Sequence, residues 1–127
     1  MGTRSLTRVI PRQEGLSFSE GHNHVDKSVV NIYKQFDGYP EGLGLDLAEF
    51  LSEFTIVNGL GADRYEPRIA NGVGCLAAQL VGYLKDGPGN IYLEELNGEP
   101  GDHWEEYIYT LYPKENEPTY MSIYSIH

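Results

Sequence analysis

The sequence predicts an α+β protein in which an antiparallel sheet of about five strands carries two helices on one face. Three observations lead to this fold class. Segments rich in β-branched and aromatic residues lie near both ends of the chain, two segments with helical periodicity follow one another in the middle, and glycines and prolines separate them. The expected order is ββααβββ, and strands joined by hairpins favour an antiparallel sheet covered by both helices.

The first part of the chain predicts two strands. At 127 residues the chain has the length of one domain, and we interpret residues 1–127 as a single domain. A short strand at 7–10 is stopped by a proline, and a second strand runs from 28 to 36. Residues 11–27 between them are polar, which indicates a hairpin connection or an insertion.

The middle of the chain predicts two helices, each preceded by a glycine-rich connection. A dense cluster of turn residues at 37–44 leads to a helix whose apolar residues recur at three- and four-residue spacing. A second connection, 58–74, is expected to be a loop and leads to a helix over about 73–85. The apolar residues of the two helices are Leu47, Phe50, Leu51 and Phe54, then Leu76, Leu80, Val81 and Leu84.

The remaining residues predict strands at 91–93, 107–112 and 120–126. The last two strands are expected to form a hairpin around a short polar segment at 113–118, whose composition is typical of a turn.

The charge of the chain excludes a duplex nucleic acid as its partner. The net charge is −10 and becomes more negative along the sequence. Residues 1–36 carry five basic and three acidic side chains, residues 37–85 three and seven, and residues 86–127 one and nine, so the balances are +2, −4 and −8. Clustered Lys and Arg are needed to neutralise a phosphate backbone. A small anion needs only two or three cations and stays possible.

No apolar run is long enough to cross a membrane, so we expect no membrane association. The N-terminus lacks the apolar stretch of a signal peptide, and the single Cys75 fits a reducing compartment. These features predict a cytoplasmic protein.

The two junctions between a glycine-rich loop and a helix are the strongest indication of a ligand site. A helix N-terminus presents unpaired N–H groups and the positive end of the helix dipole, and glycines let a ligand approach the backbone. The second junction adds the cations Arg64 and Arg68 ahead of Asn71, Gly72 and Gly74. Ordinary turns that need a positive φ would have the same composition, and the spacing matches no nucleotide-binding fingerprint.

Tyrosine is abundant, with ten residues, and a tyrosine can stack on a base while its hydroxyl forms a hydrogen bond. Most of them are expected simply to favour β-structure. Tyr39 differs because it lies inside a glycine and proline turn, where packing does not obviously need a large side chain.

Two further patterns suggest chemistry. Cys75 falls in the first turn of the second helix, where the dipole can lower the pKa of a thiol, and His103 precedes a strand that could bring it to Cys75. A lone cysteine is more often a small buried residue. On a strand His22, His24 and Asp26 would share one face and could bind zinc, although a solvated loop suits this segment better. We expect no cofactor.

Three segments of the chain carry a resemblance to a known group of proteins. They are Met1-Gly2-Thr3-Arg4-Ser5-Leu6-Thr7, Tyr33-Lys34-Gln35-Phe36-Asp37-Gly38-Tyr39-Pro40 with Gly42 and Gly44, and Asn71-Gly72-Val73-Gly74-Cys75-Leu76-Ala77-Ala78-Gln79-Leu80. In these segments the chain resembles a family of short phage and bacterial proteins whose activity is not established. Many small phage proteins are accessory factors, and one recurrent type sequesters cyclic or ADP-ribose-like nucleotide signals of bacterial immunity. That connection is an analogy of size and setting.

These observations lead to the hypothesis of a non-enzymatic protein that binds a small nucleotide-derived anion and acts as a sponge in phage counter-defence, in the cytoplasm of the host cell. Arginines would meet phosphates, a tyrosine would stack on a base, and polar side chains would read its edge or the ribose. A domain this small has little interior to spare, so we expect a homo-oligomer. The residues are Arg4, Arg8, Tyr33, Gln35, Asp37, Gly38, Tyr39, Arg64, Arg68, Asn71, Gly72 and Gly74.

Two alternatives stay open. One is a cysteine-dependent hydrolase that uses Cys75 and His103. The other is an acidic inhibitor that binds a protein through residues 86–127, as an anti-defence factor or a nucleic-acid mimic.

Overall fold

The computed structural model describes residues 3–12, 28–59, 68–96 and 105–125. Within them the chain forms seven strands, two α-helices and one π-helical turn. In order these are β1 (Ser5–Val9), β2 (Val30–Lys34), η3 (Pro40–Gly44), α1 (Leu45–Ser52), β3 (Thr55–Val57), β4 (Ile69–Asn71), α2 (Gly72–Leu84), β5 (Ile91–Leu93), β6 (Tyr107–Tyr112) and β7 (Tyr120–Ser125).

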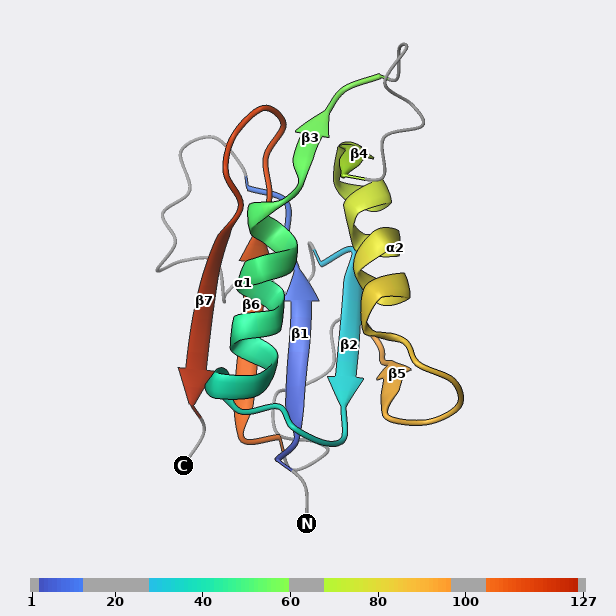
Figure 1. The fold of residues 1–127 in the computed structure, drawn as a ribbon, viewed down its shortest axis with the longest axis vertical. Coiled ribbons are helices and arrows are strands. Elements are labelled where there is room, and N and C mark those ends of the chain that lie inside the picture. The colour runs from blue at the N-terminus through green and yellow to red at the C-terminus, as the bar shows by residue number, and fades with distance from the viewer. Residues whose placement is uncertain (1–2, 13–27, 60–67, 97–104, 126–127) are drawn as a thin grey trace.

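The main sheet has five strands in the order β5-β2-β1-β6-β7, and both helices lie on one of its faces (Figure 1). The predicted α+β class and the two helices are therefore confirmed. The sheet is mixed rather than antiparallel, because β1 and β6 run parallel while the other three pairs are antiparallel. The parallel pairing is nonlocal, because β1 and β6 come from opposite ends of the chain and no hairpin signal encodes their contact.

Strand β1 is the centre of the sheet, and all five of its residues are buried. A central strand covered on both faces does not alternate between apolar and exposed residues. Successive residues of β1 instead point alternately into two buried regions, one on each face of the sheet. Val9 joins the core beneath the helices, whereas Leu6 joins a smaller cluster with Tyr33 and Ile108 on the opposite face.

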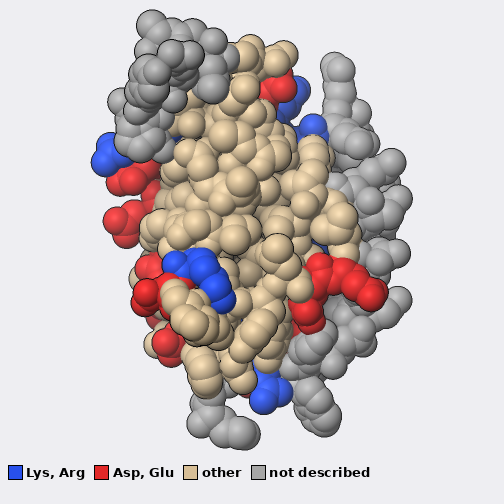
Figure 2. Space-filling model, turned by 90° about the vertical axis from the view of Figure 1, so that its right-hand side faces the viewer, with Lys and Arg blue, Asp and Glu red and all other residues tan. Residues whose placement is uncertain are grey.

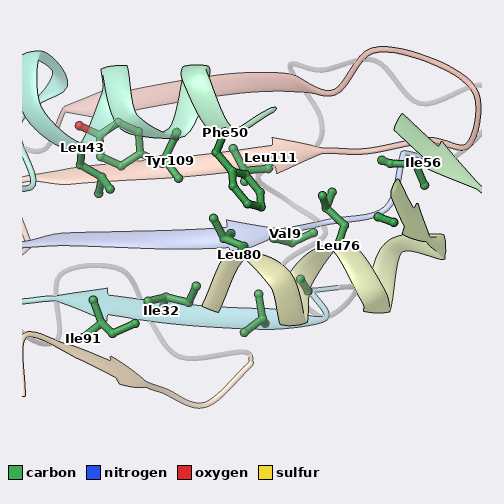
Figure 3. Packing of buried hydrophobic residues seen from close by; sticks show 14 residues of the cluster. Val9, Ile32, Leu43, Phe50, Ile56, Leu76, Leu80, Ile91, Tyr109 and Leu111 are labelled. Carbon is green, nitrogen blue, oxygen red and sulfur yellow. The ribbon is translucent and has the colours of Figure 1, made fainter. Parts of the chain in front are cut away.

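The two helices run antiparallel over the sheet, and their inner faces make the main core. The ring of Phe50 in α1 lies 4.9 Å from the ring of Tyr83 in α2, and the Tyr83 hydroxyl reaches the carbonyl of Asp46 at the start of α1. Leu76 and Leu80 of α2 meet Val9 between the two layers (Figure 3). Burying these side chains is the main source of stability in such a packing.

A second, two-stranded parallel sheet is formed by β3, which directly precedes the segment 58–74 that was expected to be a loop, and by β4, which lies inside that segment. Each strand has three residues, too few for a period-two pattern to be visible in the sequence. Ile56 and Ala70 from the middle of these strands are buried in the main core, which explains why the chain is extended there.

Four other expectations compare as follows. Helix α1 begins directly after the turn cluster 37–44, as expected, and the last five residues of that cluster form the π-helical η3. Helix α2 begins one residue earlier than expected. Residues 113–118 form the connection of the β6-β7 hairpin, as expected. The strands on either side of the segment 11–27, β1 and β2, pair antiparallel, which agrees with a hairpin connection between them. Residues 13–27 of that segment lie outside the described residues. No helix among the described residues is long and apolar enough to cross a bilayer.

Candidate functional site

The face of the main sheet that points away from the helices carries a row of buried polar side chains. Directly opposite residues of neighbouring strands point to the same face. The register places Asn31 of β2, Arg8 of β1, Thr110 of β6 and Ser122 of β7 side by side. The first three are only 2–3% exposed. Buried polar residues in a row are unusual and call for a physical explanation.

Arg8 is the centre of this row. Its side chain is 3% exposed, and its Nε atom has no hydrogen-bond partner within the described part of the chain. Burial lowers the pKa of the guanidinium, and the negative forms of Tyr112 and Glu105 oppose that shift without cancelling it. A guanidinium stays charged at every ordinary pH, so this face of the sheet holds a buried positive charge, with Glu105 as a favourable charge nearby.

The neighbours of Arg8 add hydrogen-bonding capacity. The Nδ2 atom of Asn31 donates to the carbonyl of Glu95 at 2.8 Å, which fixes the amide, whereas its Oδ1 atom has no partner among the described residues. Thr110 contributes a hydroxyl on the other side. Together a cation and a free amide oxygen match a ligand that carries both an anionic group and an N–H donor.

Aromatic and apolar side chains lie in the neighbouring row on the same face. Tyr33 is opposite Leu6, which is opposite Ile108, and these three form their own buried cluster. The ring of Tyr33 lies 6.2 Å from that of Tyr92 in β5. The face therefore combines a polar row with a flat apolar row, the two properties that a nucleobase with an anionic substituent would need.

Three of the expected ligand residues share this face, and a fourth continues it. Arg8 and Tyr33 lie in the strands themselves. Arg4 stands four residues before Arg8, where its carbonyl still accepts from the N–H of Glu106, and Gln35 continues the alternation of β2 by donating its N–H to Asn90. Their common face follows from the two-residue period of the strands.

The first glycine-rich junction serves the fold. A Cβ on Gly38 would lie 2.5 Å from Oγ of Ser5, so only glycine allows the turn to approach β1 this closely. The Gly38 N–H donates to the carbonyl of Thr3 at 2.9 Å, and its carbonyl accepts from the hydroxyl of the buried Tyr109 at 2.6 Å. Both backbone groups of Gly38 are therefore already used within the chain.

The residues around Gly38 are explained similarly. Asp37 has a φ of 58°, which completes the turn after β2. A Cβ on Gly42 would come within 3.2 Å of the ring of Tyr39, so glycine makes room for that ring, which is 39% exposed. The turn η3 runs directly into α1, and the N–H of Leu45 is taken by carbonyls within η3. Few N–H groups are left at this helix start for a ligand.

The second junction is more open. Gly72 has a φ of +84° and begins α2, and no described residue lies within 4 Å of a Cβ added at Gly72 or Gly74. The Asn71 Oδ1 atom accepts from the N–H of Gly59 at 2.7 Å. Arg68 lies 3.9 Å from the carboxylate of Glu53, and both side chains are largely exposed. The described contacts of this junction are therefore made mainly by residues next to it in the chain and in the neighbouring strand, not by a set of converging cations.

The two junctions lie at opposite ends of the helix layer. The start of α1 contacts the end of α2, and the start of α2 follows β4, which pairs with the strand after α1. Thirteen residues of α2 span about 20 Å. Arg68 belongs to the helix side of the sheet and Arg8 to the other, so these two arginines do not meet around one pocket within one chain. Arg64 lies outside the described residues.

The thiol of Cys75 is half-buried against the core and donates to Oε1 of Gln79 at 3.4 Å in its own helix. Its expected partner His103 lies outside the described residues, as do the metal candidates His22, His24 and Asp26.

An open groove of about 600 Å³ lies between the end of α1 and the β6-β7 hairpin, a site that no sequence pattern indicated. Its walls are of mixed character, with Leu51, Phe54 and Met121 on the apolar side and Asn116 and Glu117 on the polar side. It contains none of the side chains that the sequence analysis selected as ligand, catalytic or metal candidates.

Asn31, Thr110, Glu105 and Tyr112 are the members of the Arg8 site that sequence reasoning missed. A polar residue inside an apolar strand is the signal that could have found them, since Asn31 stands between Val30 and Ile32.

No protein-family model matches the chain, and no curated protein or solved structure is significantly similar to it.

Proposed function

We propose that this chain is a non-enzymatic binding protein for a small nucleotide-derived anion, and that the ligand binds on the face of the sheet opposite the helices, at Arg8. The observation that carries the proposal is the buried guanidinium of Arg8, whose Nε lacks a partner among the described residues and whose pKa is lowered by burial. An anionic group placed there would accept a hydrogen bond from Nε and would add to the compensation of a buried positive charge.

The neighbouring side chains set the ligand class. The Oδ1 of Asn31, which has no partner among the described residues, can accept an N–H, as on the edge of a base, and Tyr33 offers an aromatic surface one row away. Arg4 and Arg8 are four residues apart along an extended strand, about 13 Å. A ligand that engages both arginines must span that distance, which favours one with two separated anionic groups, such as a cyclic dinucleotide or a cyclic ADP-ribose isomer.

The burial of Arg8 also has a kinetic consequence. A side chain that is 3% exposed is reached only after the site opens. Association should therefore be slower than diffusion allows, and the apparent affinity should be reduced by the fraction of molecules that are open.

The biological role in this proposal is sequestration of an immune nucleotide signal in phage counter-defence. It rests on the resemblance to short phage and bacterial proteins. A binding protein without turnover would act in proportion to its concentration, as a sponge does.

The experiment is isothermal titration of the full chain with a panel of cyclic dinucleotides and cyclic ADP-ribose isomers. Two matched variants, Arg8→Met and Arg68→Met, each remove one guanidinium from opposite sides of the sheet. We expect at least a tenfold loss of affinity in Arg8→Met and little change in Arg68→Met, with circular dichroism showing both variants folded. The reverse pattern would move the site to the start of α2, and no binding across the panel would sink the proposal.

A further inference from the structure

The two edges of the main sheet are protected very differently. At one edge β5 has only three residues and is followed at once by Glu94 and Glu95. Short edge strands and nearby charges are the usual ways of preventing a sheet from adding another strand. That edge is therefore closed by its length and by its charge.

At the other edge β7 has none of these protections. It is six residues long, and five of its six side chains are exposed. Its sequence, Tyr-Met-Ser-Ile-Tyr-Ser, has no charge and no proline in a chain of net charge −10. Tyr120, Ile123 and Tyr124 are 46%, 46% and 64% exposed. Among the strands that the structure describes, β7 pairs on one side only, with β6, so its other side can be joined by another strand.

We propose that the occupant of this edge is β7 of a second copy, which pairs antiparallel about a two-fold axis at Ser122. Opposed residues of an antiparallel pair point to the same face of the sheet. When the two copies of β7 continue one sheet about a two-fold axis, each residue must therefore face a residue whose number differs from its own by an even number. The midpoint of every such pair is a residue, so the axis passes through a residue. The helices of both copies then lie on the same side of a ten-stranded sheet.

The sequence of β7 selects this register. With the axis at Ser122, Tyr120 faces Tyr124 and Met121 faces Ile123 of the other copy, so aromatic meets aromatic and aliphatic meets aliphatic. Moving the axis by one residue, to Ile123, would oppose Met121 to Ser125 and Ser122 to Tyr124, and would leave large side chains against small ones. Cross-strand pairs of matched apolar residues are the stabilising ones.

Charge also favours a copy of the same chain at this edge. Two molecules of −10 repel one another wherever acidic surfaces meet. No residue from Tyr120 to Ser125 is itself charged, and Arg12, whose guanidinium lies over the ring of Tyr120, is paired with Glu117. The exposed parts of the two tyrosines bury on the order of 200 Å² per copy, well below the roughly 800 Å² per partner of a standard interface. The dimer is therefore concentration-dependent.

A rival surface lies on α2, and the test must separate the two. Helix α2 contains no charged residue, and the view from its side of the molecule shows a broad uncharged surface with charges at the margins (Figure 2). Three of its four exposed residues, Gly74, Ala78 and Gly82, are small and offer little area. The fourth, Tyr83, is 47% exposed, but its hydroxyl already reaches the carbonyl of Asp46 in α1. A helix also has no unpaired backbone groups along its side. These properties make α2 a weaker candidate than β7.

Sedimentation velocity between 10 µM and 1 mM tests the interface with two variants of equal charge change. The native chain should shift from its 14.3 kDa monomer toward twice that mass as concentration rises. Ser122→Lys should stay monomeric, because the two lysines face each other at the axis, and Ala78→Lys should dimerise normally. Mixing Ser122→Lys with Ser122→Glu should restore the dimer. A monomeric native chain at 1 mM, or a dimer lost in Ala78→Lys alone, would overturn the proposal.

Cysteine cross-linking tests the register in a Cys75→Ser background. Residues at the axis face each other at about 4.5–5.5 Å between Cα atoms, within reach of a disulfide. The two copies of residue 120 would be four residues apart along the strand direction, about 13 Å. Ser122→Cys should therefore form a covalent dimer under mild oxidation and Tyr120→Cys should not. Equal cross-linking of both variants would refute this register.

Discussion

Replacing Arg8 by methionine should make the protein more stable, and the reason is the burial of a positive charge. Methionine keeps an unbranched stem of similar length and removes the guanidinium. Burial is the largest influence on the pKa of Arg8 and lowers it, so the surroundings disfavour the charged form despite Tyr112 and Glu105. The charge is present in the native state at neutral pH because a guanidinium does not deprotonate there.

The expected gain is about 1–3 kcal/mol. Replacement of a whole buried ion pair by apolar residues of similar volume is often neutral or stabilising by roughly 1–4 kcal/mol, and Arg8→Met removes a buried charge in the same way but without its neighbour. We take the lower part of that range because Glu105, 4% exposed, loses a favourable charge when Arg8 is removed. For a chain of this length about 1 kcal/mol corresponds to a shift of roughly 3–5 °C in Tm.

The assay is urea denaturation at pH 7 followed by circular dichroism, together with calorimetry. Arg12→Met is the matched control, because Arg12 is bonded to Glu117 at 3.1 Å and its guanidinium lies 4.6 Å from the ring centre of Tyr120. That variant should lose stability. If Arg8→Met is instead destabilised by more than about 1 kcal/mol, the guanidinium is well compensated in the native state, and the argument for an anion site loses its main support.

Three further predictions concern the turn beneath the helices. Tyr109→Phe removes a buried 2.6 Å hydrogen bond to the carbonyl of Gly38, so the free energy of unfolding measured by urea denaturation should fall by about 1–3 kcal/mol. An unchanged free energy would mean that the carbonyl finds another donor. Burial raises the pKa of Tyr109 above its ordinary value, so its contribution is intact below pH of about 10 and is lost as pH rises toward the folded pKa. Stability should fall above pH 10 by up to about 1.4 kcal/mol per pH unit from this residue, and the Tyr109→Phe variant should show a correspondingly shallower fall. Gly38→Ala should lower the free energy of unfolding by about 2–3 kcal/mol, because the new Cβ would lie 2.5 Å from Oγ of Ser5. Gly74→Ala, with no described residue within 4 Å of its Cβ, should raise the free energy of unfolding by about 0.5–1 kcal/mol through its higher helix propensity. Equal effects of the two substitutions would contradict this steric reasoning.

Much of the fold follows from local patterns. The bounds of β5 and β6 and the positions of both helices were predictable, because periodicity is carried by residues only a few positions apart. The strands β3 and β4 were not, since three residues are too few to show a period. Their extended form depends on the burial of Ile56 and Ala70 in a core that the rest of the chain supplies.

The candidate site divides in the same way. Arg8 and Tyr33 could be selected from the sequence as a cation and an aromatic residue, and so could Arg68. The sequence could not show which of these residues lie together. Asn31 and Thr110 come 23 and 102 residues after Arg8 and meet it only through strand register.

The sequence alone therefore establishes the types of element, the acidic charge and the residues with binding chemistry, because each depends on composition or on near neighbours in the chain. Tertiary structure decides that β1 lies parallel to β6, that Gly38 receives the hydroxyl of Tyr109 from 71 residues away, and that the helix starts lie far apart. These are contacts between distant segments. Their free energy comes from burying a shared interior, and no local pattern records which segments will share it.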